Sequence, residues 1–208
     1  MNRNTLVFIS VALLAAAAGV LAGALLLAPA EPAQLVAGTK LETPRPLPAF
    51  QLVRDDESPF TRADFEGEWQ LVFFGFTHCP DVCPNTLFLL DRVVEQLDNA
   101  DHVAPEVVFV SVDPERDTPE QVKQYVEYFN DDFVGVTAHG SDDGMENLQR
   151  LTQAMSVAYE FHPEGDSYEV IHSSAVLLVN PEAEMHALFT PPLNAADIAA
   201  DLAQLISN

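Results

Sequence analysis

The chain has 208 residues, a formal net charge of −23 at pH 7 and only two lysines, Lys40 and Lys123. A surface this negative repels nucleic acid and anionic lipid head groups, and nothing in the composition indicates a phosphate-binding surface. The charge is typical of a solubility adaptation, for example to a salty medium that screens self-repulsion. The length allows one ordinary domain and an appendage.

The appendage is the N-terminal segment, where residues 6–28 carry no charge and are mostly Leu, Ala and Val. As a helix rising about 1.5 Å per residue, this run could cross a hydrocarbon core of about 30 Å. We therefore expect residues 1–30 to form a transmembrane anchor. A cleaved signal peptide is the alternative, because small residues follow at 28–30. Arg3 precedes the span and Glu31 follows it, which predicts a bacterial inner-membrane protein with its domain in the periplasm.

The next segment, residues 31–48, is rich in proline and lacks periodicity, so we expect a linker. Residues 49–208 then alternate strand and helix patterns. The predicted elements, in chain order, are a strand at 69–76, a helix at 84–99, a strand at 106–113, helices at 120–129 and 142–155, strands at 173–180 and 184–189, and a helix at 194–206. Thr118 is the expected N-cap of the second helix, with Pro119 at its first position. This order predicts an α/β fold with a central mixed sheet flanked by helices.

Both cysteines, Cys79 and Cys83, lie between the first buried strand and its helix, which favours a thioredoxin-like arrangement. A disulfide closing so short a loop constrains the unfolded chain little, so a chemical role is expected rather than a structural one. Pro84 suits the first helical position, which predicts Cys83 as the N-cap. Free amides and the helix dipole then favour thiolates. Such a pair serves both redox exchange and binding of a soft metal, so the loop leaves both open.

A third ligand would decide between these chemistries, and histidine is the main candidate. Zinc would need two further ligands, whereas Cu(I) is soft, takes thiolate readily and accepts imidazole too. His172 stands just before the strand at 173–180, where a thioredoxin-like sheet places it beside the cysteine loop. Its position alone is equally compatible with a ligand and with a structural histidine. His78 adjoins Cys79, but neighbouring side chains at a strand end point to opposite sides, so we interpret it as a modulator. His102, His139 and His186 are expected to be solvated or to lie on the surface. His162, which precedes Pro163 in an expected loop, is a less favoured candidate for the third ligand.

Three segments together resemble the Sco/SenC family of membrane-anchored, thioredoxin-like copper proteins needed for assembly of cytochrome c oxidase. They are GFTHCPDVCPNTL (75–87), VSVDPERDTPEQVKQY (110–125) and IHSSAVLLVNP (171–181). The resemblance covers roughly residues 48–206. From the residues alone, the segment beginning at Asp113 is interpreted as structural, a strand end that leads into a helix.

The resemblance implies that copper is bound by Cys79, Cys83 and His172. It also implies that Asp81, inside the cysteine loop, takes part in partner interaction or metal transfer. The family usually has an acidic residue immediately before the distal histidine, and Ile171 stands there in this chain. Because groups around the ligands tune a metal site, this departure predicts weaker copper binding or an altered pH dependence.

The function expected from the resemblance is that of a copper chaperone, not of a turnover enzyme. It would hold Cu(I), and Cu(II) after rearrangement, and pass copper to the dinuclear site of cytochrome c oxidase subunit II or to another copper-accepting protein. The first alternative is a thiol–disulfide oxidoreductase with Cys79 and Cys83 as its catalytic pair, which would reduce the cysteines of that partner. A peroxide-reducing enzyme is disfavoured because Phe76, not threonine, stands three residues before Cys79. A third alternative is an anchored binding domain with a structural disulfide, which would bind no metal.

Overall fold

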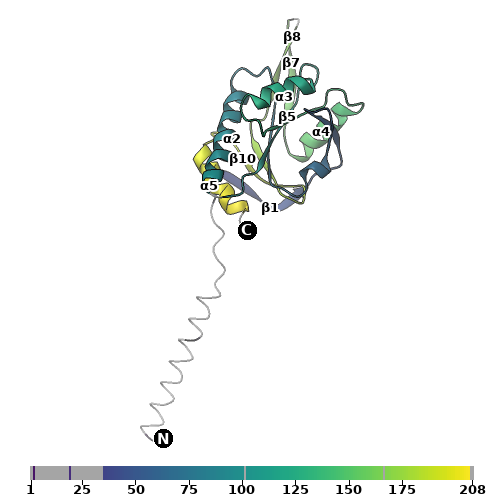
Figure 1. Cartoon of the computed structure of the whole chain (residues 1–208). Helices are drawn as coiled ribbons and strands as arrows, with labels where there is room; N and C mark the ends of the chain where they lie inside the picture. Colours follow the sequence, from purple (N-terminus) through teal and green to yellow (C-terminus); the bar gives the residue numbers. More distant parts are fainter. Residues whose placement is uncertain (1, 3–18, 20–34, 101, 166, 207–208) are drawn as a thin grey trace. The chain divides into compact units, whose positions relative to one another are not determined.

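The computed structural model describes residues 2, 19, 35–100, 102–165 and 167–206 (Figure 1). The transmembrane anchor expected at 1–30 therefore lies almost entirely outside the described residues. Within the described ranges, no helix combines the length and the apolar character needed to cross a membrane. Residues Leu35–Asn208 form one compact unit, which contains both cysteines and His172.

Eight strands of this unit form one mixed sheet, as the sequence predicts. Their order across the sheet is β1-β10-β9-β4-β5-β6-β2-β3, with parallel pairing from β4 to β5 and from β5 to β6 and antiparallel pairing elsewhere. The strands are β1 (Gly38–Pro46), β2 (Gln51–Arg54), β3 (Pro59–Thr61), β4 (Gln70–Gly75), β5 (Glu106–Ser111), β6 (Val134–Thr137), β9 (Val176–Val179) and β10 (Glu184–Phe189). A short 3-10 helix, η1 (Arg62–Phe65), follows β3.

Strand β4 is the centre of the core, and all of its residues are buried. Both its faces are covered, which is why its sequence is a continuous apolar run and not an alternating one. Four helices flank the sheet: α2 (Val82–Asn99) packs on α5 (Ala195–Ile206), α3 (Pro119–Glu127) contacts β6, and α4 (Gly144–Ala154) contacts β2. The expected mixed sheet flanked by helices is confirmed.

The N-terminus of α3 agrees with its prediction in detail. The Thr118 hydroxyl accepts a hydrogen bond from the Gln121 amide at 3.3 Å, and the Gln121 side chain accepts one from the Thr118 amide at 2.9 Å. Pro119 occupies the first helical position, where the missing N–H costs no hydrogen bond.

The second half of the predicted linker is not a linker, because β1 pairs with β10 at the edge of the sheet. The prolines that suggested a tether are tolerated at an edge, where one side of the backbone needs no partner. Just before β1, the buried carboxylate of Asp201 accepts hydrogen bonds from three successive amides, those of Val36, Ala37 and Gly38, at 2.8 Å each. These contacts dock the start of the strand on α5.

A two-stranded hairpin, β7 (Tyr159–Glu164) and β8 (Ser167–His172), was not predicted. It forms a sheet of its own and projects from the rest of the unit (Figure 1). His172 is the last residue of β8, and β9 starts only at Val176, so the strand predicted at 173–180 is shorter than expected. His162 lies in β7, not in a loop. The segment predicted as the approach to a strand is therefore itself a strand.

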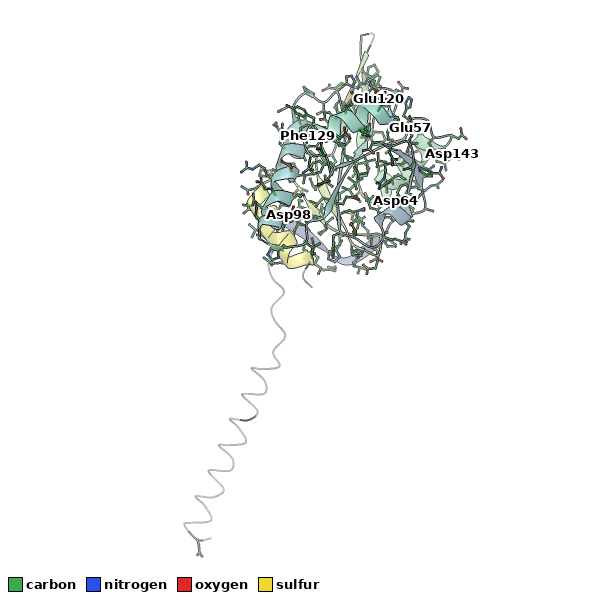
Figure 2. All side chains as sticks on the ribbon, viewed as in Figure 1. Glu57, Asp64, Asp98, Glu120, Phe129 and Asp143 are labelled. Atoms are coloured by element: carbon green, nitrogen blue, oxygen red, sulfur yellow. The ribbon has the colours of Figure 1, made fainter. Side chains whose placement is uncertain are left out.

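The negative charge is carried largely by exposed side chains. Figure 2 labels examples on three helices: Asp98 of α2, Glu120 of α3 and Asp143, the N-cap of α4, all exposed. Carboxylates in such positions are fully hydrated, which agrees with a solubility role for the charge.

Candidate metal centre

The cysteine loop connects the buried end of β4 to α2, and its helix starts earlier than predicted. α2 begins at Val82, with Asp81 as the N-cap, so Cys83 is the second helical residue and not the cap. Pro84 consequently occupies the third position. The first-turn amides of a helix have no partner within the helix, so proline is tolerated at each of these positions and does not identify the first one.

Cys83 is buried, and its sulfur lies against the backbone of the last β4 residue, Gly75. A Cβ atom at Gly75 would come within 2.8 Å of the Cys83 Sγ and within 2.8 Å of the Phe109 ring. Real Cβ atoms do not approach other atoms so closely, so the absence of a side chain at Gly75 makes the space for this sulfur.

Cys79 is half-buried and its sulfur faces the start of α2, where the Cys83 amide donates a hydrogen bond to it at 3.4 Å. The adjacent Cys83 side chain is the main cause that lowers the pKa of Cys79 to about 3, with contributions from His172 and the amides of Cys83 and Asp81 against the opposing effect of burial. The pKa of Cys83 is raised, first by its neighbour Cys79 and then by burial. The metal-free pair therefore holds one thiolate, on Cys79, and one thiol.

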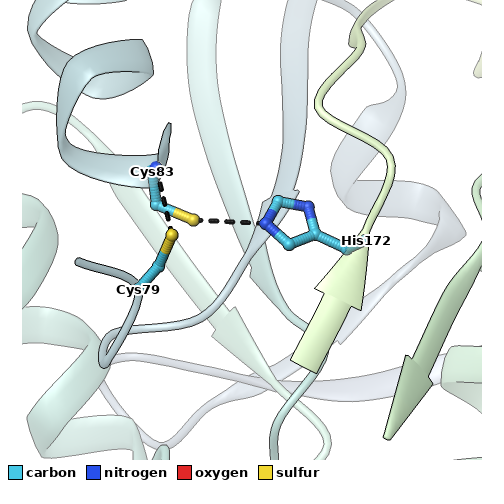
Figure 3. A group of neighbouring side chains, drawn as sticks. All are labelled: Cys79, Cys83 and His172. Carbon is cyan, nitrogen blue, oxygen red and sulfur yellow. Dashed lines mark hydrogen bonds between the residues drawn. The ribbon is translucent and has the colours of Figure 1, made fainter. Parts of the chain in front are cut away.

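His172 brings its imidazole to this pair from the end of β8 (Figure 3). Its Nε2 lies 3.4 Å from the Cys83 Sγ. Its Nδ1 lies 2.9 Å from the Ser173 carbonyl oxygen, which can only accept, so Nδ1 carries a proton and Nε2 is the ring nitrogen that faces the sulfurs. The rings of Phe73 and Phe76 pack edge-on against the imidazole, with centroids 6.0 and 5.8 Å away.

The candidate ligand atoms of Cys79, Cys83 and His172 all lie within 4.8 Å of one another. A metal with bonds of about 2.0–2.3 Å holds its ligand atoms up to about 4.6 Å apart, so small side-chain movements suffice to bring all three onto one ion. Two sulfurs and one imidazole nitrogen form a soft donor set, of the kind that suits Cu(I). The structure thus brings together the three residues on which the sequence analysis centred.

The predicted modulators lie beside this group. His78 has a side chain that is 53% exposed, and its Nδ1 lies 3.1 Å from the Thr77 hydroxyl and 3.7 Å from the Asp117 carboxylate. The Asp81 carboxylate accepts a hydrogen bond from the Asn85 side chain at 2.6 Å. The neighbour in sequence of the distal histidine, Ile171, is 54% exposed. None of these three contributes an atom to the group of possible ligands among the described residues.

A hollow of about 460 Å³ opens beside the group and is lined by Cys79, His172 and residues of both flanking segments. It gives the Cys79 sulfur access to solvent and to an approaching molecule. A larger hollow, about 780 Å³, lies between α4 and the β7–β8 hairpin and contains none of the three residues. The larger of the two hollows is therefore not the one that lies beside the candidate metal ligands.

Sequence reasoning missed two further residues at the site, Arg116 and Tyr168, which line the smaller hollow. A signal for the hairpin that carries Tyr168 was nevertheless present. Apolar and polar residues alternate from Tyr159 to Pro163, and again from Tyr168 to Val170, on either side of a Gly-Asp pair. Such alternation around a glycine-containing turn is typical of a β-hairpin.

Comparison with known proteins now identifies relatives of the chain. Residues 39–207 match the family described as SCO1/SenC. A protein of Stutzerimonas stutzeri provisionally named as copper-binding is 36% identical over 166 residues, which cover 79% of this chain and 78% of that protein. The chain spans between 39% and 51% of the length of six mitochondrial relatives.

Solved structures agree with this relationship. The crystal structure of Arabidopsis thaliana ScoI with copper bound superposes with a TM-score of 0.71 at 31% identity, covering 77% of this chain and 98% of that one. The structure of BsSco, described as a Sco-family cytochrome c oxidase assembly protein with a disulfide switch, gives a TM-score of 0.61 at 26% identity and covers 81% and 98%. The thioredoxin-like fold and the family expected from the cysteine and histidine segments are thereby confirmed: this chain belongs to the SCO1/SenC family.

Proposed function

We propose that this protein is a copper chaperone for the assembly of cytochrome c oxidase, and that Cys79, Cys83 and His172 bind its copper. The convergence of two sulfurs and one imidazole nitrogen within 4.8 Å is the observation that carries this proposal. Copper-bound structures of relatives support the choice of metal. The soft donor set favours Cu(I), with Cu(II) accepted after rearrangement of the ligands.

Transfer requires an open side of the site, and Cys79 provides it. Its sulfur is half-buried and lines the hollow of about 460 Å³, whereas Cys83 is buried behind it. A three-coordinate ion leaves room for a thiolate of the acceptor to bind before the ligands of the chaperone leave. The proposed acceptor is the dinuclear copper site of cytochrome c oxidase subunit II, and Asp81, at the rim of the same hollow, is placed to meet it.

We also propose that the N-terminal segment anchors the domain in the bacterial inner membrane, with the domain in the periplasm. Residues 6–28 carry no charge and are long enough, as a helix, to span the hydrocarbon core. Residues 35–208 form the copper-binding domain. An anchor would hold the domain at the surface where a membrane-bound oxidase is assembled.

Anaerobic titration of the reduced protein with Cu(I), in competition with a chromophoric chelator, tests the proposal. The wild type should bind one copper per chain. His172→Ala should bind it about 10- to 100-fold more weakly with an unchanged circular dichroism spectrum, since a ligand is lost. His162→Ala is the matched control, because it removes an exposed imidazole from β7 of the same hairpin. A Cu(I) affinity of His172→Ala equal to that of the wild type would contradict the proposal of three ligands.

A second function, thiol–disulfide exchange, is favoured by the unequal protonation of the two cysteines. The lowered pKa of Cys79 and the raised pKa of Cys83 describe a nucleophilic thiolate beside a second thiol that can complete a disulfide. This activity would use the Cys79–Cys83 pair without His172. Two measurements distinguish the oxidoreductase from the copper chaperone: the reduction potential of the cysteine pair, and the reductase activity of His172→Ala toward oxidised subunit II. Reduction that survives this substitution supports the oxidoreductase.

A further inference from the structure

His172 reaches the cysteines from a strand that is not part of the main sheet. Within the described part of the chain, β8 pairs only with β7, and the hairpin is joined to the sheet by the chain that runs on from His172 to β9. Main-chain pairing therefore does not fix the distance between the imidazole and the sulfurs. Contacts between side chains must hold the hairpin against the cysteine loop.

Tyr168, four residues before His172 in β8, makes the first of these contacts. Its hydroxyl donates a hydrogen bond of 2.6 Å to Asp113 Oδ1. The second oxygen of the same carboxylate, Oδ2, accepts a hydrogen bond of 2.5 Å from Arg116 Nε. Asp113 has no exposed side-chain surface. Burial, followed by the bond to Asp113, raises the pKa of Tyr168 to about 12, so the phenol keeps the proton that it donates.

Arg116 extends this contact to the cysteine loop. Its guanidinium lies 4.1 Å from the ring centroid of Tyr168, on the hairpin, and 5.9 Å from that of Phe76, three residues before Cys79. The Phe76 ring in turn packs on the imidazole of His172. A guanidinium between two aromatic faces is attracted to both rings, so it links the two segments that carry the candidate ligands.

Asp117, one turn after Asp113, holds the cysteine loop itself. Its buried carboxylate accepts hydrogen bonds from the Thr77 amide at 3.0 Å and from the Thr77 hydroxyl at 2.6 Å. The Ser111 hydroxyl joins the two carboxylate sites, because it donates to Asp117 at 2.6 Å and accepts from the Asp113 amide at 3.0 Å. The short segment from Asp113 to Asp117 thus contacts the cysteine loop through Asp117 and the β7–β8 hairpin through Asp113.

We propose that Asp113, Arg116 and Asp117 form a bracket that fixes the His172 hairpin relative to the Cys79–Cys83 loop, and that Tyr168 is the hairpin residue through which the bracket positions His172 for copper. The inference rests on the proposed copper site. It gives a specific function to the segment beginning at Asp113, which was interpreted from the sequence as a structural strand end that leads into a helix. Burying a carboxylate and pairing it with a guanidinium is at best weakly stabilising, so placement of a ligand is a better account of this network than stability.

Tyr168→Phe tests the bracket, because it removes one hydroxyl and keeps the ring on which Arg116 stacks. We expect Cu(I) affinity to fall about tenfold, the effect typical of lost partners behind a metal ligand. Arg116→Lys keeps the charge but loses the planar stacking, and we expect a fall of at least the same size. Tyr159→Phe is the matched control: this tyrosine is also on the hairpin, and the variant should bind copper as the wild type does.

A double substitution separates positioning from general destabilisation. If Tyr168 acts through His172, adding Tyr168→Phe to His172→Ala should not weaken copper binding further. An equal loss in both backgrounds would mean that Tyr168 acts on the cysteines or on the whole fold, and would overturn the bracket. Unchanged affinity in Tyr168→Phe, when His172→Ala binds copper more weakly than the wild type, would overturn it as well.

Hydrogen exchange of the metal-free protein gives a readout that needs no copper. In Tyr168→Phe, the amides of β8 should exchange about tenfold faster, since the hairpin has lost a charge-assisted hydrogen bond, while those of β4 should be unchanged. If the wild type fails to bind Cu(I), the proposed function is wrong. The exchange rates of the β8 amides still test whether the bracket holds the hairpin, because they need no metal. Unchanged exchange in β8 would refute the bracket whatever the metal does.

Discussion

The two halves of the candidate metal centre are built in different ways. Cys79 and Cys83 follow β4, a strand whose six residues are all buried, and Cys83 sits within the first turn of a helix of 18 residues. His172 ends a six-residue strand that pairs only with its hairpin partner. The sulfurs are placed by the hydrophobic core, whereas the imidazole is placed by polar and aromatic contacts together with one buried valine of the hairpin, Val170.

This difference suits a protein that takes up a metal and gives it away. A site with all ligands on rigid elements would bind copper tightly but release it slowly, because no ligand could leave without disturbing the core. A ligand on a separately held hairpin can be withdrawn at a much smaller cost in free energy, since segments with few buried apolar contacts open at low free energy. In the proposed chaperone, the cysteines would then keep the ion until a thiolate of the acceptor arrives.

The largest effect should come from disturbing the rigid half. Gly75→Ala would place a Cβ within 2.8 Å of the Cys83 Sγ. Overpacking of this kind costs about 1–3 kcal/mol in the free energy of unfolding, and displacement of the sulfur should also weaken Cu(I) binding. Urea unfolding and chelator competition measure the two effects.

Gly135→Ala on β6 is the control for Gly75→Ala. Its Cβ would come within 2.5 Å of Val122, and β6 is separated by β5 from the strand that leads to the cysteines. We expect a similar loss of unfolding free energy with copper affinity unchanged. Equal affinities in the two variants would show that the space at Gly75 does not fix the Cys83 sulfur.

The rigid half is also the half that the sequence predicts well. A continuous apolar run followed by a cysteine loop and an amphipathic helix led to β4, α2 and the placement of Cys79 and Cys83 between them. The error there was small: Pro84 suggested the first helical position, but proline is equally compatible with the third. Local patterns suffice where the core decides the structure.

The hairpin half was harder to predict because its contacts join distant residues. The bond between Tyr168 and Asp113 spans 55 positions, and the contact between Cys83 and His172 spans 89. A repeating pattern of apolar and polar residues does not reveal contacts between residues so far apart in the sequence. His172 was nevertheless singled out, from its position before a buried strand and from the family resemblance, although the strand that carries it was missed. Likewise, β1 was mistaken for a linker because an edge strand can contain proline.

An intermediate effect should appear when copper binds. In the metal-free protein, the amides of β7 and β8 should exchange faster than those of β4 and β5, because the hairpin is backed by fewer buried contacts. One equivalent of Cu(I) should slow exchange in β8 and leave β4 nearly unchanged, since binding restrains only the mobile ligand. Hydrogen exchange with mass spectrometry, with and without metal, measures both. Slowing of equal size in β4 and β8 would contradict the division into two halves.

The smallest effect is expected at Ile171, where the family resemblance led us to expect an acidic residue and weaker copper binding without it. Neighbouring residues in a strand point to opposite faces, and Ile171 is 54% exposed while the imidazole of His172 faces the sulfurs. A carboxylate at this position would act on the copper ion mainly through solvent. Exposed charge interactions are weak, so Ile171→Asp should raise Cu(I) affinity by about two- to fivefold at most, and less at high salt.

Ile171→Asn separates charge from shape, because its side chain matches that of aspartate and is neutral. We expect it to bind copper as the wild type does at every salt concentration, so that the difference between the two variants is the electrostatic contribution alone. A gain well above tenfold in Ile171→Asp that persists in high salt would show a direct contact with the ion or with His172. The hairpin would then have to turn about its axis on binding, and the imidazole would be held less firmly than Tyr168 and Arg116 suggest.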